Sequence, residues 1–276
     1  MRIDLHTHSS ASDGTDPPAE VMRRAREAGV DVIALTDHDT LAGQQEARAA
    51  LPPGLTLVQG MELSCRLDGH STHMLAYLPR GMNQELAEQA RAIREDRVRR
   101  GRAMVERLRA LGVPVTWDEV ERLAAGGSVG RPHIARAMVA AGAIGRPQDA
   151  FTAEWIGSGG RAYVSRYALD PGRAIALINE SGGAAALAHP GTATRGWRIG
   201  DDVITTLAGQ GMAGIEIDHP DHDQAERARL RALAAELDLV PTGGSDDHGE
   251  LTGHRLGSES AAPEAFERLM ARTSSA

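Results

Sequence analysis

Short apolar runs alternate with stretches of helical periodicity along most of the chain. The runs expected to form strands cover 3–6, 32–36, 55–65, 73–77, 184–188, 214–218 and 239–243. Helical patterns at 18–28, 41–50, 171–180, 201–210, 224–237 and 263–271 fall between them, and the first has Pro in its first turn and Gly at its end. This alternation is typical of βα units around a mostly parallel sheet, so we expect an α/β barrel.

The alternation stops between residues 79 and 163, where helical periodicity continues at 84–111, 117–125 and 131–141 without a strand. We therefore expect a barrel built from residues 1–78 and 164–276, with residues 79–163 inserted as a helical subdomain. The first inserted helix is rich in arginine and poor in carboxylates, which is typical either of a solvated helix face or of a surface that faces an anion. Its arginines are Arg91, Arg94, Arg97, Arg99, Arg100, Arg102, Arg107 and Arg109.

Composition narrows the class of protein. A length of 276 residues suits one barrel with an insertion, and 41% hydrophobic with 25% charged residues is ordinary for a globular chain. The net charge of −8 disfavours unspecific attraction to polyphosphate backbones or anionic membranes, and only 3% of residues are aromatic, which disfavours a base-stacking nucleic-acid module. We expect neither duplex DNA nor a membrane as a partner, and the sequence leaves the oligomeric state open.

The chain contains no lysine, which excludes Schiff-base chemistry, a Walker A phosphate loop and a lysine general base. Its single cysteine, Cys65, lies in an apolar run and is expected to be a buried thiol rather than a nucleophile. One cysteine cannot form an internal disulfide, and the chain begins without an apolar leader. These features predict a cytoplasmic protein.

Most of the 11 histidines lie at the carboxyl ends of predicted strands, which is the barrel face on which active sites are assembled. His6 and His8 in DLHTHSS are two residues apart and share one face of an extended strand. Glu62 is a lone carboxylate within GMELSC, where burial is costly unless it is paired or binds a cation. Further polar residues at strand ends are Asp13, Asp37, His38, Asp39, His73, His189, His219, Asp246, Asp247 and His248.

Taken singly, each of these residues can be a satisfied polar group, but together they predict a metal centre. Mixed imidazole and carboxylate clusters suit Mn, Fe or Zn better than Ca or Mg. His70 and His254 are expected on the surface. His133 on an inserted helix and His222 just beyond a strand end have an intermediate setting.

The ordered series DLHTHSSASDG, LTDHDT, GMELS, a following His, AHP and GSDDHG resembles the PHP (polymerase and histidinol phosphatase) family of metal-dependent phosphoesterases. The resemblance spans residues 1–77 and 163–256 and implies a distorted (β/α)7 barrel that holds up to three divalent ions, Mn or alternatively Fe or Zn. It implies that His6, His8, Glu62 and Asp246 bind the first ion, that Glu62 bridges to a second held by His73 and His189, and that Asp13, His38 and His248 bind the third. Many relatives have His where this chain has Asp13.

The segments GRPHIARAM and IEIDHPDH resemble a subgroup of that family, the 3′,5′-nucleoside bisphosphate phosphatases, some of which trim RNA from its 5′ end. This implies a small nucleotide or a short RNA 5′ end as substrate. Contacts that relatives make through Lys must fall to Arg here or be missing. The residues expected to act in catalysis are Glu62, Asp246, His248 and His219, and those expected to bind substrate are Arg131, His133 and His222.

Three alternatives use similar residues. A histidinol-phosphatase-like phosphomonoesterase shares the barrel and the metals, but its small substrate would not require the helical insertion. A non-catalytic metal-binding module would be expected to lack some ligands, which are all present here. An amidohydrolase typically centres on a carboxylated Lys or on a single metal ion, and this chain has no Lys to carboxylate.

Overall fold

The computed structural model describes residues 1–191 and 198–273. Seven strands form one sheet in which spatial order follows sequence order. The first and last strands approach each other, because Thr7 bridges to Asp247 and the backbone N–H of His8 donates to the carbonyl of Asp247 at 2.9 Å. The sheet is thus nearly closed into the expected distorted barrel. Its strands are β1 Ile3–Thr7, β2 Val32–Leu35, β3 Thr56–Leu67, β4 His70–Tyr77, β5 Ala184–Leu187, β6 Gly214–Asp218 and β7 Val240–Gly243.

The sheet is mixed. β1, β2 and β3 run parallel, as do β5, β6 and β7, but β4 runs antiparallel to both of its neighbours. β3 and β4 form a hairpin through Asp68 and Gly69, whose φ angles of 47° and 83° suit a two-residue turn that requires left-handed residues. The hairpin lengthens both strands beyond the apolar runs that predict them, and it carries His73 to the same end of the barrel as Glu62.

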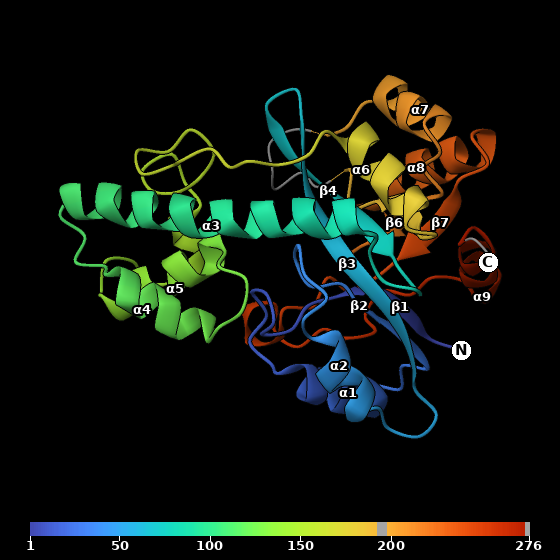
Figure 1. The fold of residues 1–276 in the computed structure, drawn as a ribbon, viewed down its shortest axis with the longest axis horizontal. Coiled ribbons are helices and arrows are strands. Elements are labelled where there is room, and N and C mark those ends of the chain that lie inside the picture. The colour runs from blue at the N-terminus through green and yellow to red at the C-terminus, as the bar shows by residue number, and fades with distance from the viewer. Residues whose placement is uncertain (192–197, 274–276) are drawn as a thin grey trace.

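Helices cover the outside of the sheet at every predicted position (Figure 1). The second helix is shorter than expected, because residues 41–43 form a turn before it begins. Among the described residues, no helix combines the length and apolar character needed to cross a membrane. The barrel helices are α1 Pro18–Glu27, α2 Gln44–Ala49, α6 Pro171–Glu180, α7 Asp201–Gly209, α8 Gln224–Glu236 and α9 Pro263–Ala271, with a short η3 at Gly249–Leu251.

Residues 79–163 contain no strand, as expected. They form α3 Gln84–Ala110, α4 Trp117–Ala124, α5 Arg131–Ala140 and the short η1 Pro147–Ala150. Figure 1 shows α3 extending from the barrel to the group formed by α4 and α5. This group has its own hydrophobic cluster around Met104, Leu108 and Val120 from the first two helices and Ile134 and Met138 from α5. The division of the chain into two domains at these boundaries remains a prediction.

Candidate active site

Four side chains from three separated segments converge at the carboxyl end of the barrel. His6 and His8 belong to β1 and the residues after it, Glu62 to β3, and Asp246 to the loop after β7. The Nε2 atoms of the two histidines are 3.1 Å apart, and each lies 3.3 to 3.5 Å from Glu62 Oε2 and from Asp246 Oδ1. Four ligands that surround one ion tetrahedrally at about 2.1 Å stand about 3.4 Å from one another. These four atoms therefore fit one divalent metal ion.

The two oxygens of Glu62 face different groups of imidazoles. Oε2 belongs to the cluster above, whereas Oε1 lies 2.6 Å from His73 Nδ1 and 2.9 Å from His189 Nε2. A carboxylate in this position can bridge two cations. The backbone of His189 has a φ of 28°, which is unusual for a residue with a side chain and is found where the surroundings dictate conformation.

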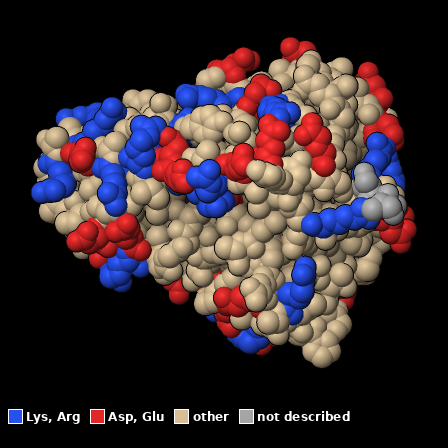
Figure 2. Space-filling model, in the orientation of Figure 1, with Lys and Arg blue, Asp and Glu red and all other residues tan. Residues whose placement is uncertain are grey.

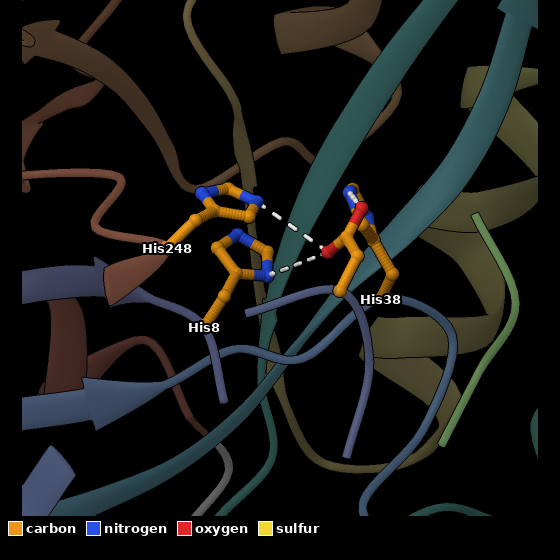
Figure 3. Close-up of side chains that lie close together, drawn as sticks. His8, His38 and His248 are labelled. Atoms are coloured by element: carbon orange, nitrogen blue, oxygen red, sulfur yellow. Dashed lines mark ion pairs between the residues drawn. The ribbon is translucent and has the colours of Figure 1, made fainter. Parts of the chain in front are cut away.

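A third group forms around Asp13. Figure 3 shows the stacked rings of His8 and His248 on one side and His38 on the other. Asp13 Oδ1 lies 3.4 Å from His248 Nε2 and Oδ2 lies 3.7 Å from His38 Nε2. His8 Nδ1 and Asp13 Oδ1 are buried, 4.0 Å apart, and neither makes a hydrogen bond within the described chain. Buried polar atoms without partners are costly, so the donor set of this group also suits a cation.

Residues behind the cluster orient its members. Glu216 Oε1 lies 3.0 Å from His6 Nδ1, and its other oxygen accepts a hydrogen bond from the His189 backbone at 2.7 Å. A carboxylate that holds one ring nitrogen fixes the tautomer and turns the other nitrogen toward a metal. Sequence reasoning missed Glu216, although the signal was the one that identified Glu62, a lone carboxylate in an apolar strand.

His219 is placed behind Asp246 rather than in the cavity. The backbone N–H of Asp221 donates to His219 Nδ1 at 3.0 Å, so the ring proton is assigned to Nε2, which lies 3.4 Å from Asp246 Oδ2. Asp246 itself has a left-handed backbone with a φ of 48°. These contacts hold its carboxylate in a single orientation, with Oδ1 directed at His6 and His8.

The cluster is electrostatically suited to cations. Burial lowers the pKa of His8, but the carboxylates of Asp246 and Glu62 outweigh burial and raise that pKa to about 10. Burial alone would raise the pKa of Glu62, yet the imidazoles of His73, His38 and His6 hold it well below its usual range. The carboxylates thus favour positive charge at His6 and His8, and a divalent cation would supply that charge in place of protons.

Gly244 lies against this cluster and predicts a test of its packing. A Cβ at Gly244 would stand 2.5 Å from both the Cβ and the backbone nitrogen of His6. These atoms cannot move without displacing the imidazole of His6 from the cluster. We expect Gly244→Ala to lower the free energy of unfolding by about 1 to 3 kcal/mol and to weaken metal binding. Gly209→Ala is the matched control, since a Cβ there meets nothing within 4 Å. Denaturant unfolding and metal titration of both variants check this, and equal effects would contradict it.

Seven members of the histidine and carboxylate cluster line a cavity of about 810 Å³. Three arginines from the insertion, Arg97, Arg100 and Arg131, and Arg166 from the segment that follows it line the same cavity. Arg97 pairs with Asp39 at 2.7 Å, and Arg100 donates to the carbonyl of Val164 at 2.6 Å. Arg166 donates to Ser71 Oγ at 2.7 Å and lies 3.1 Å from His73 Nε2, directly beside the cluster.

Arg97 is balanced by Asp39, but Arg100 and Arg166 stand among other guanidinium groups. Burial, and then the neighbouring arginines, lower the pKa of Arg100 to about 9, and burial with Arg97 lowers that of Arg166 to about 10. Because Arg remains charged at neutral pH, the lowered pKa values report repulsion and desolvation that an anion in the cavity would relieve. The arginine-rich face of α3 is therefore divided, with Arg97 and Arg100 buried toward the cavity and Arg91, Arg99 and Arg102 exposed.

Of the three residues expected to bind substrate, Arg131 alone is among the described residues that line the cavity. His133 is buried, and its Nδ1 accepts from the backbone of Gly130 at the start of α5. The ring of His222 lies between Ile217 and Gly191, with Nδ1 at 2.9 Å from a carbonyl and Nε2 accepting from a backbone N–H at 3.1 Å. Both histidines thus use their ring nitrogens to hydrogen-bond the backbone.

The remaining expectations can be compared with the structure directly. Cys65 is buried, and His70 and His254 are exposed, as expected. The nine residues expected to bind metal converge at one end of the barrel, and their individual roles remain proposals. Arg166 was missed by sequence reasoning, since it stands in a loop where no pattern marks it.

Comparison with known proteins agrees with this geometry. Residues 4–107 match the model of the PHP domain. The chain is 32% identical to the 5′-3′ exoribonuclease Rnm of Salmonella typhimurium over 96% of this chain and 91% of that protein. It is also 32% identical to the 3′,5′-nucleoside bisphosphate phosphatase of Chromobacterium violaceum, over 92% and 89% of the two chains.

A solved structure from Bifidobacterium adolescentis, of a protein assigned as a metal-dependent phosphoesterase, is also similar. It superposes with a TM-score of 0.92 at 33% identity and covers 99% of this chain and 96% of that one. The fold and the site define a metal-dependent phosphoesterase. The chain belongs to the PHP family, which confirms the resemblance drawn from its motifs.

Proposed function

We propose that this chain hydrolyses the 3′-phosphate of nucleoside 3′,5′-bisphosphates, such as adenosine 3′,5′-bisphosphate, to give the 5′-monophosphate and phosphate. One observation carries the proposal: a single cavity is lined both by seven members of the histidine and carboxylate cluster and by charged arginines. A substrate with two phosphates suits both parts, since one phosphate is hydrolysed while the other is held. The relative from Chromobacterium violaceum is named for this substrate class.

The donor set suits up to three divalent ions, for which we propose Mn, with Fe or Zn as alternatives. When bound, such ions lower the pKa of water and offset the charge that develops on the phosphoryl group. The first ion would be held by His6, His8, Glu62 and Asp246, the second by Glu62, His73 and His189, and the third by Asp13, His38 and His248.

The chain's own residues then orient ligands and substrate. Glu216 turns Nε2 of His6 toward the first group, and His219 fixes the carboxylate of Asp246, so that His219 acts by positioning rather than by touching substrate. Arg166 stands beside His73 and is suited to an oxygen of the phosphoryl group under attack, because a guanidinium offers two parallel donors. His248 holds its place through Nδ1, which lies 3.0 Å from the carbonyl of Asp246.

Arg131 would bind the phosphate that is not hydrolysed. Arg131→Ala is expected to lower kcat/KM for adenosine 3′,5′-bisphosphate about tenfold to a hundredfold, which is the usual worth of a charge-assisted hydrogen bond. Turnover of p-nitrophenyl phosphate, which has no second phosphate, should change little. Arg136→Ala is the matched control, since Arg136 lies on the same helix but outside the cavity lining. Equal losses on both substrates would mean that Arg131 supports the fold or the metal cluster.

Short RNA with a 5′-phosphate is the second candidate substrate, favoured by the charge distribution. Residues 79–163 contain 14 Arg and 10 Asp or Glu, whereas the rest of the chain contains 16 Arg and 28 Asp or Glu. Figure 2 shows the basic side chains prominent over the part of the molecule where α4, α5 and the end of α3 lie. A cationic insertion beside an acidic barrel suits a polyanion that extends out of the cavity. Digestion of 5′-phosphorylated but not 5′-hydroxyl oligoribonucleotides would support this activity.

The position of the released phosphate tests the main proposal. The Mn-loaded enzyme is incubated with adenosine 3′,5′-bisphosphate and the nucleotide product is identified by chromatography. The proposal predicts 5′-AMP, which should then resist further hydrolysis. Accumulation of 3′-AMP would reverse the assignment of the two ends of the cavity, and rapid turnover of histidinol phosphate would favour the histidinol-phosphatase-like alternative.

A further inference from the structure

A nucleoside bisphosphate also carries a base, for which neither the metal cluster nor the arginines provide an apolar partner. Among the described residues that line the cavity, Pro132, Phe151 and Tyr163 alone offer an apolar ring. Tyr163 lies under the guanidinium of Arg100, 5.5 Å from its ring centre. Pro132 and Tyr163 are half-buried whereas Phe151 is exposed, so Phe151 offers a ligand the most ring surface in this lining.

Phe151 is unusually exposed for its type. The chain has two Phe and eight aromatic residues in all, and 40% of the surface of Phe151 is exposed. The other exposed large hydrophobic residues in the described chain, Met1 and Tyr167, are outside the cavity lining. A single exposed apolar residue is ordinary on a protein surface, but Phe151 lies in a cavity, and pockets that bind small molecules are concave and lined by aromatic side chains beside a few polar groups.

The ring of Phe151 is held in place before any ligand binds. The guanidinium of Arg131 lies over the ring at 5.4 Å from its centre, and its Nη1 donates to the carbonyl of Ile156 at 3.3 Å. The backbone N–H of Phe151 donates to the carbonyl of Gln148 at 3.1 Å, and that of Ile156 donates to the carbonyl of Ala150 at 3.0 Å. These contacts order the segment that presents the ring, so little conformational entropy is lost when a ligand stacks on it.

The segment that follows Phe151 places little side-chain bulk in the cavity. Gly157, Ser158 and Gly159 line the same cavity and carry little or no side chain. Gly157 packs closely on the backbone of Phe151, whereas a Cβ at Gly159, which has a φ of 73°, would meet nothing within 4 Å. A flat group in the cavity therefore meets no large side chain from this segment.

We propose that Phe151 is the stacking platform for the nucleobase of the substrate. This proposal rests on the nucleotide substrate proposed above and adds a binding site for its third part. Base stacking on an aromatic ring tolerates every base, because each base has a π face. In this proposal the site binds nucleosides without distinguishing their bases, and the arginines and bound metal ions would contact the phosphates.

Binding of 5′-AMP and of ribose 5-phosphate to the metal-loaded enzyme tests the platform, since the two ligands differ only by the base. Phe151→Ala is expected to weaken 5′-AMP binding about fivefold to a hundredfold, which is the range for loss of one base–aromatic stack, and to leave ribose 5-phosphate unchanged. Phe151→Trp should bind 5′-AMP at least as well as the natural protein, and Phe151→Leu should be weaker than either aromatic. Tyr167→Ala is the control for loss of an exposed aromatic outside the cavity.

Two results would overturn the platform. One is unchanged 5′-AMP affinity in both Phe151→Ala and Phe151→Leu, with far-ultraviolet circular dichroism as the check that each variant is folded. The other is an equal loss for 5′-AMP and ribose 5-phosphate, which would give Phe151 a role in anion binding or in folding. Failure of the proposed function is distinguishable, because it is seen as natural enzyme that binds 5′-AMP through Phe151 but releases no phosphate from the bisphosphate.

Discussion

Glu62→Gln is expected to lower kcat for phosphate release by about a thousandfold or more, because loss of several kcal/mol of transition-state stabilisation costs a factor of ten per 1.36 kcal/mol. Both oxygens of Glu62 face imidazoles, and the side chain is 1% exposed. The amide keeps the shape of the side chain but has no charge and one acceptor oxygen. A bridge between two cation positions would therefore be lost without a large cavity being created.

Metal content and kcat measured on the same preparations check this expectation. Glu62→Gln should bind fewer ions per chain than the natural protein while its far-ultraviolet circular dichroism is unchanged. Glu259→Gln is the control, since Glu259 pairs with Arg227 at 2.6 Å and lies outside the cavity lining. Full metal content with unaltered kcat in Glu62→Gln would mean that this carboxylate is structural.

Asp39→Asn is expected to lower the free energy of unfolding by about 3 kcal/mol, the lower end of the range for breaking a buried ion pair. Asp39 is fully buried and accepts hydrogen bonds from Arg97 Nε, Ser64 N and Ser64 Oγ, each at 2.7 Å. Through Arg97 it joins α3 of the insertion to the turn that carries His38. The substitution would leave a guanidinium with 6% exposure without its counter-charge.

Asp238→Asn is the matched control for this substitution. Asp238 has a similar left-handed backbone, with a φ of 51° against 57° for Asp39, and it also pairs with arginine, at 2.9 Å from Arg268. Its side chain is 77% exposed, so the same change should cost less than about 1 kcal/mol. Urea unfolding of the two variants compares a buried pair with an exposed one, and equal costs would contradict the assigned role of Asp39.

The contribution of Asp39 should also depend on pH. Burial raises its pKa, but Arg97 and other positive neighbours outweigh burial, and the pKa of the folded state lies below its ordinary value. The folded state therefore favours the ionised form, and the stabilisation is complete above about pH 4. It is lost as the pH falls through the lowered pKa, so the difference in stability between the natural protein and Asp39→Asn should shrink in acid.

The convergence of histidines and carboxylates could be predicted from sequence because metal-binding chemistry restricts residue types at strand ends. His6 and His8 are two residues apart at the end of one strand, and Glu62 is a charged residue in an apolar strand. Burial alone would favour apolar side chains at all three positions. The same reasoning applied to Glu216 would have found it. The reversal of β4 follows from Asp68 and Gly69, a turn signal that reading the strands one by one does not use.

The arginine-lined part of the cavity is harder to predict from sequence. Arg166 and Phe151 lie in loops, where no regular spacing along the sequence tells which way a side chain points. Their positions in the cavity depend on how the insertion folds back over the barrel. His133 and His222 are expected near the site from their sequence positions. In the structure their ring nitrogens accept hydrogen bonds from backbone N–H groups at the start of a helix and in a loop. Residue type alone cannot distinguish a ligand from a backbone partner.

The ratio of kcat/KM for adenosine 3′,5′-bisphosphate to that for 3′-AMP tests most directly whether one phosphate is held while the other is hydrolysed. In the proposed mode of binding, both compounds would present the same 3′-phosphate to the histidine and carboxylate cluster, and they differ in the 5′-phosphate that would reach the arginines. Binding energy from a remote group that is realised in the transition state raises this ratio. We expect a ratio of about ten to a hundred for the Mn-loaded enzyme, falling toward one in Arg131→Ala. A ratio near one in the natural protein would contradict the second phosphate site.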